Sequence, residues 1–404
     1  MRALVVAGAR PNFVKVAPIL AELKARGDTC RLVHTGQHYD AAMSDAFFAD
    51  LQLPRPDYHL GVGSGTHAEQ TARIMERFEP VLLQARADWL ILVGDVNSTL
   101  GCALVAAKLK EETGCRIAHV EAGLRSGDWR MPEEINRVVT DRLSDLLLTH
   151  SPEAVTNLLR EGIPGDHVRF VGNVMIDSLY AQLPRARELA KPERLHLHRG
   201  GFALATVHRP SNVDDPESLC VLLEALNAVA KQMPVVLPIH PRTKSRATEA
   251  GLELLLDGLI VIPPLGYLDM LSMMDAAAVV LTDSGGVQEE TTALGVPCVT
   301  LREQTERPIT ISVGTNRLAP FPLTTDGVLD TVHAALAQGR VEPGSRSPAG
   351  WDGRASQRAI VAMTHYDQRF PRSRPTAATG NSERASQLAV RTSAIVSAQR
   401  STRV

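Results

Sequence analysis

Residues 278–294 read Ala278-Val-Val-Leu-Thr-Asp283-Ser-Gly-Gly286-Val-Gln-Glu-Glu290-Thr-Thr-Ala-Leu294. The first five residues form an apolar run of strand length, and apolar residues at helical spacing follow over 286–294. A continuously apolar strand that passes through a short turn into a helix is typical of a parallel sheet covered by helices on both faces. The segment therefore predicts an α/β fold built on a parallel sheet.

The same alternation of strand and helix patterns occurs along the rest of the chain. We expect strands at 3–7, 31–35, 89–93, 116–120 and 146–149, and again at 202–207, 234–239, 259–262, 278–282 and 297–301. Helical patterns lie at 13–26, 98–112, 133–144, 216–231, 267–274 and 286–294. We therefore predict two Rossmann-like doubly wound domains, 1–172 and 173–350, joined somewhere within 172–200. A C-terminal helix at 351–371 could pack back on the first domain, and a mobile tail is expected over 372–404.

Length and composition exclude several classes of protein. The 404 residues suit two domains of about 150–200 residues each. With 44% hydrophobic and 22% charged residues, the chain is neither disordered throughout nor a membrane protein, and no apolar run approaches the length of a transmembrane helix. A net charge of −2 gives no reason to expect a nucleic acid or a membrane as partner. The five scattered cysteines predict reduced thiols in a cytoplasmic protein.

Polar clusters follow several of the predicted strands, and ligands bind beyond the carboxyl ends of strands in open α/β sheets. With two such domains, the cleft between them is the default site. The clusters are Gly8-Ala9-Arg10-Pro11-Asn12 with Lys15, Gly94-Asp95-Val96-Asn97-Ser98-Thr99, His119-Val120-Glu121, His208-Arg209, His240-Pro241-Arg242 and Asp283-Ser284-Gly285-Gly286.

The glycine-rich turn in the second half has the chemistry of a phosphate site. Ser284, Gly285 and Gly286 stand where a helix begins, and the backbone N–H groups and dipole of a helix start suit a diphosphate. Glu290 follows in the same helix, where a carboxylate could hold a ribose diol. His208 could donate to phosphate or move a proton near neutral pH. For each turn taken alone, an ordinary capped turn with a surface charge is the alternative.

Three acids in the first half stand after predicted strands or near a helix start. Glu121 closes an apolar run, and a charged group in such a place is paired or catalytic, because charged groups are seldom fully buried without partners. Asp95 lies in the loop after the strand at 89–93, where function is common in this architecture, and a turn role is its alternative. Glu133 lies near a helix start with Arg137 four residues on, so a surface salt bridge between the two is the alternative. His119 and Glu121 flank one residue, but no further His or Cys completes a metal set, and we reject a zinc site.

Taken together, these clusters resemble the non-hydrolysing UDP-N-acetylglucosamine 2-epimerases over roughly residues 3–366. The resemblance is also carried by Thr35-Gly36-Gln37-His38, Pro132-Glu133-Glu134-Ile135-Asn136-Arg137 and Thr305-Glu306-Arg307-Pro308. It implies the glycosyltransferase-B architecture, with two Rossmann-like domains facing across a cleft, usually in a homodimer. It also implies reversible inversion at C2, in which UDP-N-acetylglucosamine eliminates UDP to give 2-acetamidoglucal and UDP adds back to give UDP-N-acetylmannosamine. No cofactor is implied.

The family motifs assign roles to individual positions. The resemblance implies that the catalytic residues are Asp95, Glu121, Glu133 and His208. The candidate contacts with the UDP-sugar are Arg10, Lys15, Arg137, Arg209, His240, Ser284, Gly285, Gly286, Glu290 and Arg307. Gln37, His38 and Gln70 match a regulatory substrate site of some members, although Glu69 stands where those members have Arg. Which carboxylate removes the C2 proton is left open.

Other functions remain open on the sequence alone. A hydrolysing epimerase that releases N-acetylmannosamine and UDP would share the fold and many of these residues. A glycosyltransferase of similar architecture would need an acceptor and would leave the three acids without a purpose. A non-enzymatic nucleotide-sugar sensor would not need the acids either.

Overall fold

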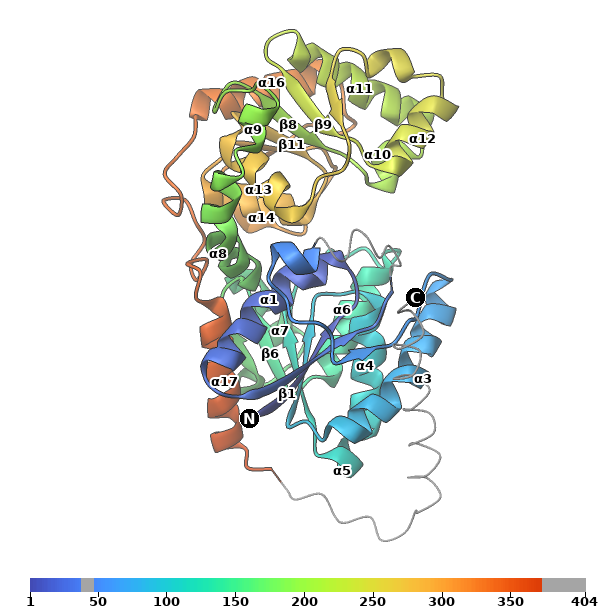
Figure 1. Ribbon diagram of the computed structural model, residues 1–404, viewed down its shortest axis with the longest axis vertical. Coiled ribbons are helices and arrows are strands. Elements are labelled where there is room, and N and C mark those ends of the chain that lie inside the picture. The colour runs from blue at the N-terminus through green and yellow to red at the C-terminus, as the bar shows by residue number, and fades with distance from the viewer. Residues whose placement is uncertain (38–46, 373–404) are drawn as a thin grey trace. The chain divides into compact units, whose positions relative to one another are not determined.

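The computed structural model describes residues 1–37 and 47–372, and the chain forms two compact units (Figure 1). Unit 1 comprises Met1–Ser178 together with the chain that begins at Gly353, and unit 2 comprises Leu179–Asp352. Each unit contains one sheet, and all strand pairs in both sheets are parallel. The predicted fold class, α/β with two Rossmann-like units, is confirmed.

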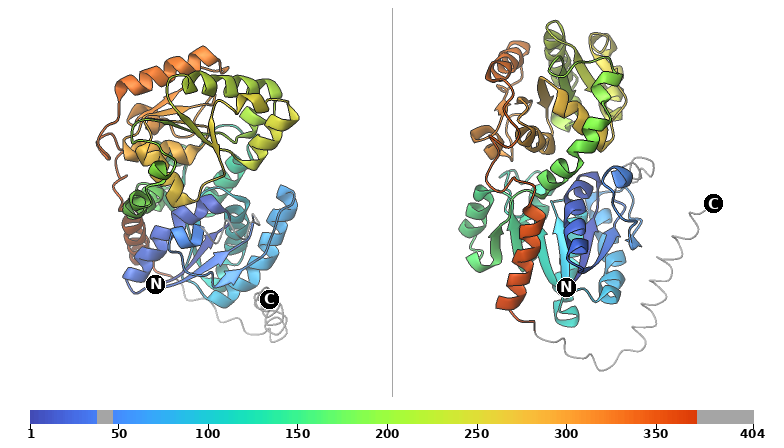
Figure 2. Two further views of the ribbon diagram at one scale, coloured as in Figure 1. Left: turned by 45° about the horizontal axis from the view of Figure 1, so that its top comes forward. Right: turned by 60° about the vertical axis from the view of Figure 1, so that its left-hand side comes forward.

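Unit 1 contains a seven-stranded sheet in the order β3-β2-β1-β4-β5-β6-β7. The strands are β1 (Arg2–Ala7), β2 (Thr29–His34), β3 (Tyr58–His59), β4 (Trp89–Val93), β5 (Arg116–Val120), β6 (Leu146–Thr149) and β7 (Val168–Phe170). The helices are α1 (Arg10–Ala25), α3 (His67–Ala85), α4 (Asn97–Lys108), α5 (Lys110–Thr113), α6 (Pro132–Leu143), α7 (Pro152–Arg160), η1 (Gly165–His167) and α17 (Ala355–Arg369). Helices α1 and α17 lie side by side on one face of the sheet, and α3, α4 and α6 pack together on the other (Figure 1, Figure 2).

Unit 2 contains a six-stranded sheet in the order β10-β9-β8-β11-β12-β13. The strands are β8 (Ala203–Thr206), β9 (Val235–Pro238), β10 (Ile260–Ile262), β11 (Val279–Thr282), β12 (Cys298–Thr300) and β13 (Asn316–Leu318). The helices are α9 (Lys191–Arg194), α10 (Pro210–Val213), α11 (Pro216–Ala230), α12 (Pro241–Glu249), η2 (Glu253–Leu255), α13 (Tyr267–Ala276), α14 (Gly285–Leu294), α15 (Pro308–Ser312) and α16 (Thr325–Gln338). The segment expected to join the domains is largely helical, because α8 (Val174–Glu188) runs through the division between the units.

The central strands of each sheet are buried along their whole length. Every residue of β4 and β5 in unit 1, and of β8 and β11 in unit 2, is buried. Burying an aliphatic side chain contributes about 1.5–3 kcal/mol, so continuously apolar strands are most stable in the middle of the sheet, where both of their faces are covered. The strands predicted at 89–93, 116–120 and 146–149 are confirmed in full. None of the helices in the described part of the chain combines the length and the hydropathy that a membrane span needs.

Helix α17 closes unit 1 by packing against α1 and β6. The Asp177 carboxylate of α8 accepts hydrogen bonds at the start of α17 from the N–H of Ala355 (3.0 Å) and from the N–H (2.7 Å) and hydroxyl (2.6 Å) of Ser356. Near the other end, Asp367 accepts a hydrogen bond from Trp89 Nε1 at 3.0 Å and pairs with Arg116. Both ends of α17 are therefore anchored to unit 1, which carries Asp95, Glu121 and Glu133.

We expect Asp177→Ala to lower the free energy of unfolding by about 2–4 kcal/mol, because it leaves the buried N–H groups at the start of α17 without their acceptor. Chemical denaturation followed by circular dichroism measures this loss. Asp326→Ala, which removes an exposed acid from the first turn of α16, serves as the control. An equal effect of the two substitutions would contradict the capping role of Asp177.

Candidate active site

Asp95 and Glu121, the first two predicted catalytic acids, lie directly beyond the ends of two neighbouring strands of unit 1. β4 pairs with β5 so that Val93 lies opposite Val120. Gly94 and Asp95 continue from β4, Glu121 continues from β5, and the Gly94 N–H donates to the Val120 carbonyl at 3.1 Å. The register of two buried strands thus brings both acids to the edge of the sheet where ligands bind in this fold.

Glu121 forms an ion pair with Lys15 of α1, and the two side chains are only 9% and 12% exposed. Both turns at this point have left-handed backbone, with φ of 71° at Glu121 and 66° at Gly94. A Cβ on Gly94 would lie 3.2 Å from Lys15 Nζ, so glycine leaves room for the ion pair. A non-glycine residue in this conformation is strained, and such strain clusters at functional sites.

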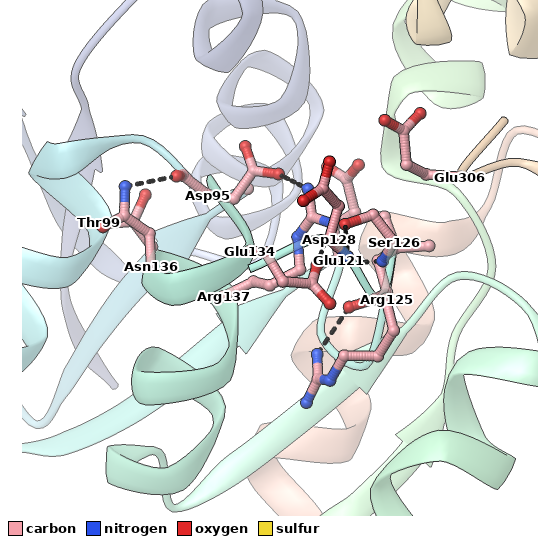
Figure 3. Close-up of polar contacts among 12 residues, drawn as sticks. Asp95, Thr99, Glu121, Arg125, Ser126, Asp128, Glu134, Asn136, Arg137 and Glu306 are labelled. Atoms are coloured by element: carbon pink, nitrogen blue, oxygen red, sulfur yellow. Dashed lines mark hydrogen bonds and ion pairs between the residues drawn. The ribbon is translucent and has the colours of Figure 1, made fainter. Parts of the chain in front are cut away.

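Asp95 is held by Arg137 of α6, which also pairs with Glu134 at 2.7 Å (Figure 3). Asn136 donates a hydrogen bond to the Asp95 carbonyl at 2.9 Å. Arg137 is 4% exposed and thus belongs to the buried face of α6. The surface salt bridge between Glu133 and Arg137 that the spacing allowed is therefore replaced by the pairs with Asp95 and Glu134.

Glu133 is half-buried and lines a cavity of about 260 Å³ in unit 1. Most of the other lining side chains are polar; they include Gln37, His67, Gln70, Asp95, Asn97 and Asn136. Two of the three predicted catalytic acids, Asp95 and Glu133, therefore face the same polar cavity.

A buried histidine–aspartate pair links the two strand-end turns. His119 of β5 has Nε2 at 2.8 Å from the Gly94 carbonyl and Nδ1 at 2.6 Å from Asp141 of α6. Asp141 accepts a hydrogen bond from the Gly123 N–H at 3.0 Å and pairs with Arg125 at 2.8 Å. Sequence reasoning missed Asp141, although an acid at a core-facing helical position needs a partner and could have signalled it.

The predicted regulatory residues hold one another. The Gln37 side-chain carbonyl accepts hydrogen bonds from the Ser98 N–H (3.2 Å) and hydroxyl (2.8 Å). The Gln70 side-chain amide donates to the backbone carbonyl of Gln37 at 3.1 Å. Glu69 caps the start of α3, where Thr66 is the N-cap residue. His38 lies outside the described residues. Arg10, predicted to contact the substrate, is the first residue of α1.

In unit 2, Asp283 fixes the turn that carries His208. It follows β11, and its buried Oδ2 accepts hydrogen bonds from the N–H groups of His208 (2.9 Å) and Arg209 (2.8 Å) and from the Asn212 amide (3.2 Å). Its Oδ1 lies 3.3 Å from Nδ1 of His208, whose side chain is 46% exposed. Asp283 therefore fixes the backbone of this turn, and its carboxylate lies beside the partly exposed His208 ring. Asp283 was not predicted as a site residue, although it too closes an apolar run.

The next strand end adds a second histidine. His240 is the N-cap residue of α12, and its Nδ1 accepts a hydrogen bond from the Arg242 N–H at 3.2 Å. Its ring centroid lies 6.2 Å from that of His208. The predicted residues His208, Arg209 and His240 therefore lie together at the ends of β8 and β9.

The start of α14 is built to receive an anion. The helix begins at Gly285 after the N-cap residue Ser284, so the first N–H groups of Gly285 and Gly286 stand at its positive end. A Cβ on Gly285 would lie 3.8 Å from the guanidinium carbon of Arg307, and Arg307 Nε donates to Glu289 at 2.9 Å. The structure thus gathers Ser284, Gly285, Gly286 and Arg307 in one cluster whose chemistry suits a phosphate.

Glu290 lies in the same helix and is buried. Burial raises the pKa of Glu290 to about 7, a hydrogen bond from the Tyr267 hydroxyl opposes this rise, and the Glu289 charge adds to it. Burial likewise raises the pKa of Tyr267. At neutral pH this carboxyl can thus both donate and accept hydrogen bonds.

These features define a class of protein. In one Rossmann-like unit the strand ends carry acids paired with cations, and in the other a helix that begins with two glycines lies next to an arginine. Such features are typical of enzymes that act on phosphorylated substrates. In the described part of the chain, no group of three or more His, Cys, Asp or Glu residues is placed to hold a metal ion. The chain belongs to the UDP-N-acetylglucosamine 2-epimerase family, whose family model matches residues 21–364. This match confirms the resemblance that the sequence motifs indicate. UDP-N-acetylglucosamine 2-epimerases are isomerases, so the chain is assigned to that class of enzyme.

Individual relatives act on two different sugars. The chain is 42% identical over 329 residues to a UDP-N-acetylglucosamine 2-epimerase of Methanocaldococcus jannaschii, covering 79% of this chain and 88% of that protein. It is 43% identical over 322 residues to the UDP-2,3-diacetamido-2,3-dideoxy-D-glucuronate 2-epimerase of Pseudomonas aeruginosa, covering 79% and 88%. The crystal structure of the Methanocaldococcus jannaschii enzyme in complex with UDP-GlcNAc and UDP matches with a TM-score of 0.79 at 38% identity, covering 90% of this chain and all of that one.

We expect Glu290→Gln to stabilise unit 2 at alkaline pH and to change little at acidic pH. Glu290 binds its proton more tightly in the folded than in the unfolded protein, so its contribution to stability is present below about pH 4.5 and is lost as the pH rises through about 7. The amide stays neutral, and its advantage at pH 8.5 is roughly 2–3 kcal/mol. Urea denaturation at pH 5 and pH 8.5 measures the difference.

The control for this experiment is Glu253→Gln, which changes an exposed acid of η2 in the same unit. It should alter stability equally little at both pH values. If Glu290→Gln gave the same change at pH 5 and pH 8.5, the raised pKa of Glu290 would be contradicted.

Proposed function

We propose that the protein is a non-hydrolysing epimerase that interconverts UDP-N-acetylglucosamine and UDP-N-acetylmannosamine. Besides membership of the family, the observation that carries the proposal is the pairing of Asp95 with Arg137 and of Glu121 with Lys15 at adjacent strand ends. Such pairs fix the direction of the carboxylates, and a base that takes a proton from carbon must be held in position.

The reaction inverts C2 without oxidation. A carboxylate takes the proton from C2, the electron pair of that bond forms the C1=C2 double bond, and the C1–O bond breaks so that UDP leaves with its electrons. Re-addition of UDP to C1, with return of a proton to the other face of C2, gives the epimer. Because one face must lose a proton and the other must gain one, two groups are needed, and unit 1 offers Asp95, Glu121 and Glu133.

Unit 2 would hold the nucleotide. The start of α14 and Arg307 suit the diphosphate, whose charge grows as UDP leaves, and N–H groups and a guanidinium that are already oriented stabilise that charge. Glu290 can accept hydrogen bonds from ribose hydroxyls. His208, held by Asp283, can donate to the departing phosphate or exchange a proton with it.

A second candidate substrate is UDP-2,3-diacetamido-2,3-dideoxy-D-glucuronate, because a relative of that name is 43% identical to this chain. Its epimerisation also inverts C2 next to an acetamido group and can use the same proton chemistry. The two sugars differ at C3 and at the carboxylate that replaces the C6 hydroxymethyl group.

We expect proton NMR in deuterated water to show conversion of UDP-N-acetylglucosamine into an equilibrium mixture with UDP-N-acetylmannosamine, with deuterium entering at C2. Asp95→Asn, Glu121→Gln and His208→Ala should each lower turnover by about 10²–10⁴-fold, because each removes a proton-transfer or positioning group. Glu111→Gln, at an exposed acid of α5, should keep the native rate.

Other products would decide against the proposal. Accumulation of free N-acetylmannosamine with UDP would indicate the hydrolysing reaction, and turnover only with an added acceptor would indicate a transferase. Conversion of UDP-2,3-diacetamido-2,3-dideoxy-D-glucuronate alone would establish the second candidate substrate. Near-native rates in all three site variants would refute the assignment of the residues.

We further propose that the protein acts as a homodimer through the outer face of α3, α4 and α6. An apolar hollow of about 430 Å³ lies on this face; its apolar lining residues include Ala68, Ala72, Met75, Leu100, Pro132 and Ile135. Ile135 is 43% exposed. An exposed apolar hollow of this kind is a common feature of subunit interfaces.

We expect Ala72→Glu to convert the dimer into monomers, because it places a charge in the apolar hollow. Light scattering coupled to gel filtration measures the mass. Ala21→Glu, the same substitution on an exposed position of α1, is the control and should leave the mass unchanged. A monomeric native protein, or a dimer that tolerates Ala72→Glu, would contradict the proposal.

A further inference from the structure

The start of α6 carries two adjacent acids, and the structure gives them different surroundings. Glu133 is half-buried and lines the polar cavity together with Asp95. Glu134 is 2% exposed and does not line the cavity. The two carboxylates thus cannot serve the same purpose.

The Glu134 carboxylate is fully engaged in hydrogen bonds. One oxygen accepts from the Ser126 N–H at 3.0 Å and from Arg137 Nη1 at 2.7 Å, and the other accepts from the Gly127 N–H at 3.0 Å (Figure 3). Removing a carboxylate from water is costly, and these three donors offset that cost. A carboxylate so placed accepts hydrogen bonds and is not available to a substrate.

Arg137 connects Glu134 to the proposed catalytic acid. One terminal nitrogen of its guanidinium donates to Glu134 and the other donates to Asp95. The planar guanidinium has a fixed fork of donors, so an acceptor that holds one nitrogen also sets the direction of the other. Glu134 therefore determines where Arg137 can place the Asp95 carboxylate.

The charges of this trio also differ in their exposure. Two carboxylates share one guanidinium, so the three groups carry one net negative charge. Glu134 is buried, whereas the Asp95 side chain is 28% exposed and faces the cavity. Asp95 is therefore the acid of this trio that a substrate can reach.

We propose that Glu134 is a positioning residue, which acts through Arg137 to orient Asp95 for proton transfer. The inference rests on the proposed epimerase function. Its buried carboxylate also fixes the turn at Ser126 and Gly127 that leads from Glu121 to Glu133. Glu134 therefore contributes to the rate of the chemical step, while substrate affinity depends on groups that touch the UDP-sugar.

Steady-state kinetics of Glu134→Gln test this inference. We expect kcat to fall about 10–100-fold, the effect of a small misplacement of a reacting group, with KM for UDP-N-acetylglucosamine within about 3-fold of the native value. In an Arg137→Lys background, Glu134→Gln should lower kcat less than about 3-fold. Lysine cannot bind Glu134 and Asp95 through the two ends of one planar group, so the coupling between these acids is already lost. The matched control is Glu161→Gln, which removes another arginine-bound carboxylate of unit 1, that of the Arg125 pair.

The outcomes separate the two proposals. Native kcat in Glu134→Gln, a rise in KM alone, or an equal loss of kcat in both backgrounds would overturn the positioning role. A native enzyme that does not epimerise UDP-N-acetylglucosamine would instead refute the proposed function. If Glu134→Gln does not fold, Glu134→Asp can be tested instead, because it keeps the negative charge on a side chain that is shorter by one methylene group. It should show the same fall in kcat with unchanged KM.

Discussion

The parallel pairing of β4 with β5 is the constraint on which the site in unit 1 depends. With Val93 opposite Val120, the chain emerges as Gly94-Asp95 on one strand and as Glu121 on the next. A shift of one residue in either strand would turn its side chains to the opposite face of the sheet. Ten buried residues, eight of them apolar, secure this register. Hydrophobic burial in the two strands therefore places the two acids next to each other.

Buried charges around these acids are compensated in pairs. Asp95 and Glu134 share Arg137 (Figure 3). Glu121 pairs with Lys15, and Asp141 connects His119 with Arg125. Replacing a buried ion pair by apolar residues is often neutral or stabilising, so stability alone does not explain such a concentration of charge. It is explained if the side chains must be held in fixed directions, because pairs with defined geometry restrict rotation at each strand end.

The sequence predicts the parts of this arrangement that depend on local pattern. Continuous apolar runs identified the central strands, and an acid at the end of such a run identified Asp95 and Glu121 as candidates. Partners distant in sequence were not predictable: Asp141 lies 22 residues from His119, and Arg137 lies 42 residues from Asp95. The salt bridge considered between Glu133 and Arg137 followed from helical spacing alone, whereas the fold turns Arg137 towards Asp95. Edge strands such as β3, with two residues, are too short to leave a pattern.

The pairing of charges also bears on the choice between the two candidate sugars. A glucuronate carboxylate that leaves water needs a cation as partner. Among the described side chains at the strand ends of unit 1, Lys15, Arg125 and Arg137 each pair with an acid of the protein. A glucuronate carboxylate that approached any of these three cations would have to compete with the acid that the cation already binds. N-acetylglucosamine is neutral at C6 and needs no such partner, so these three ion pairs can stay intact when it binds.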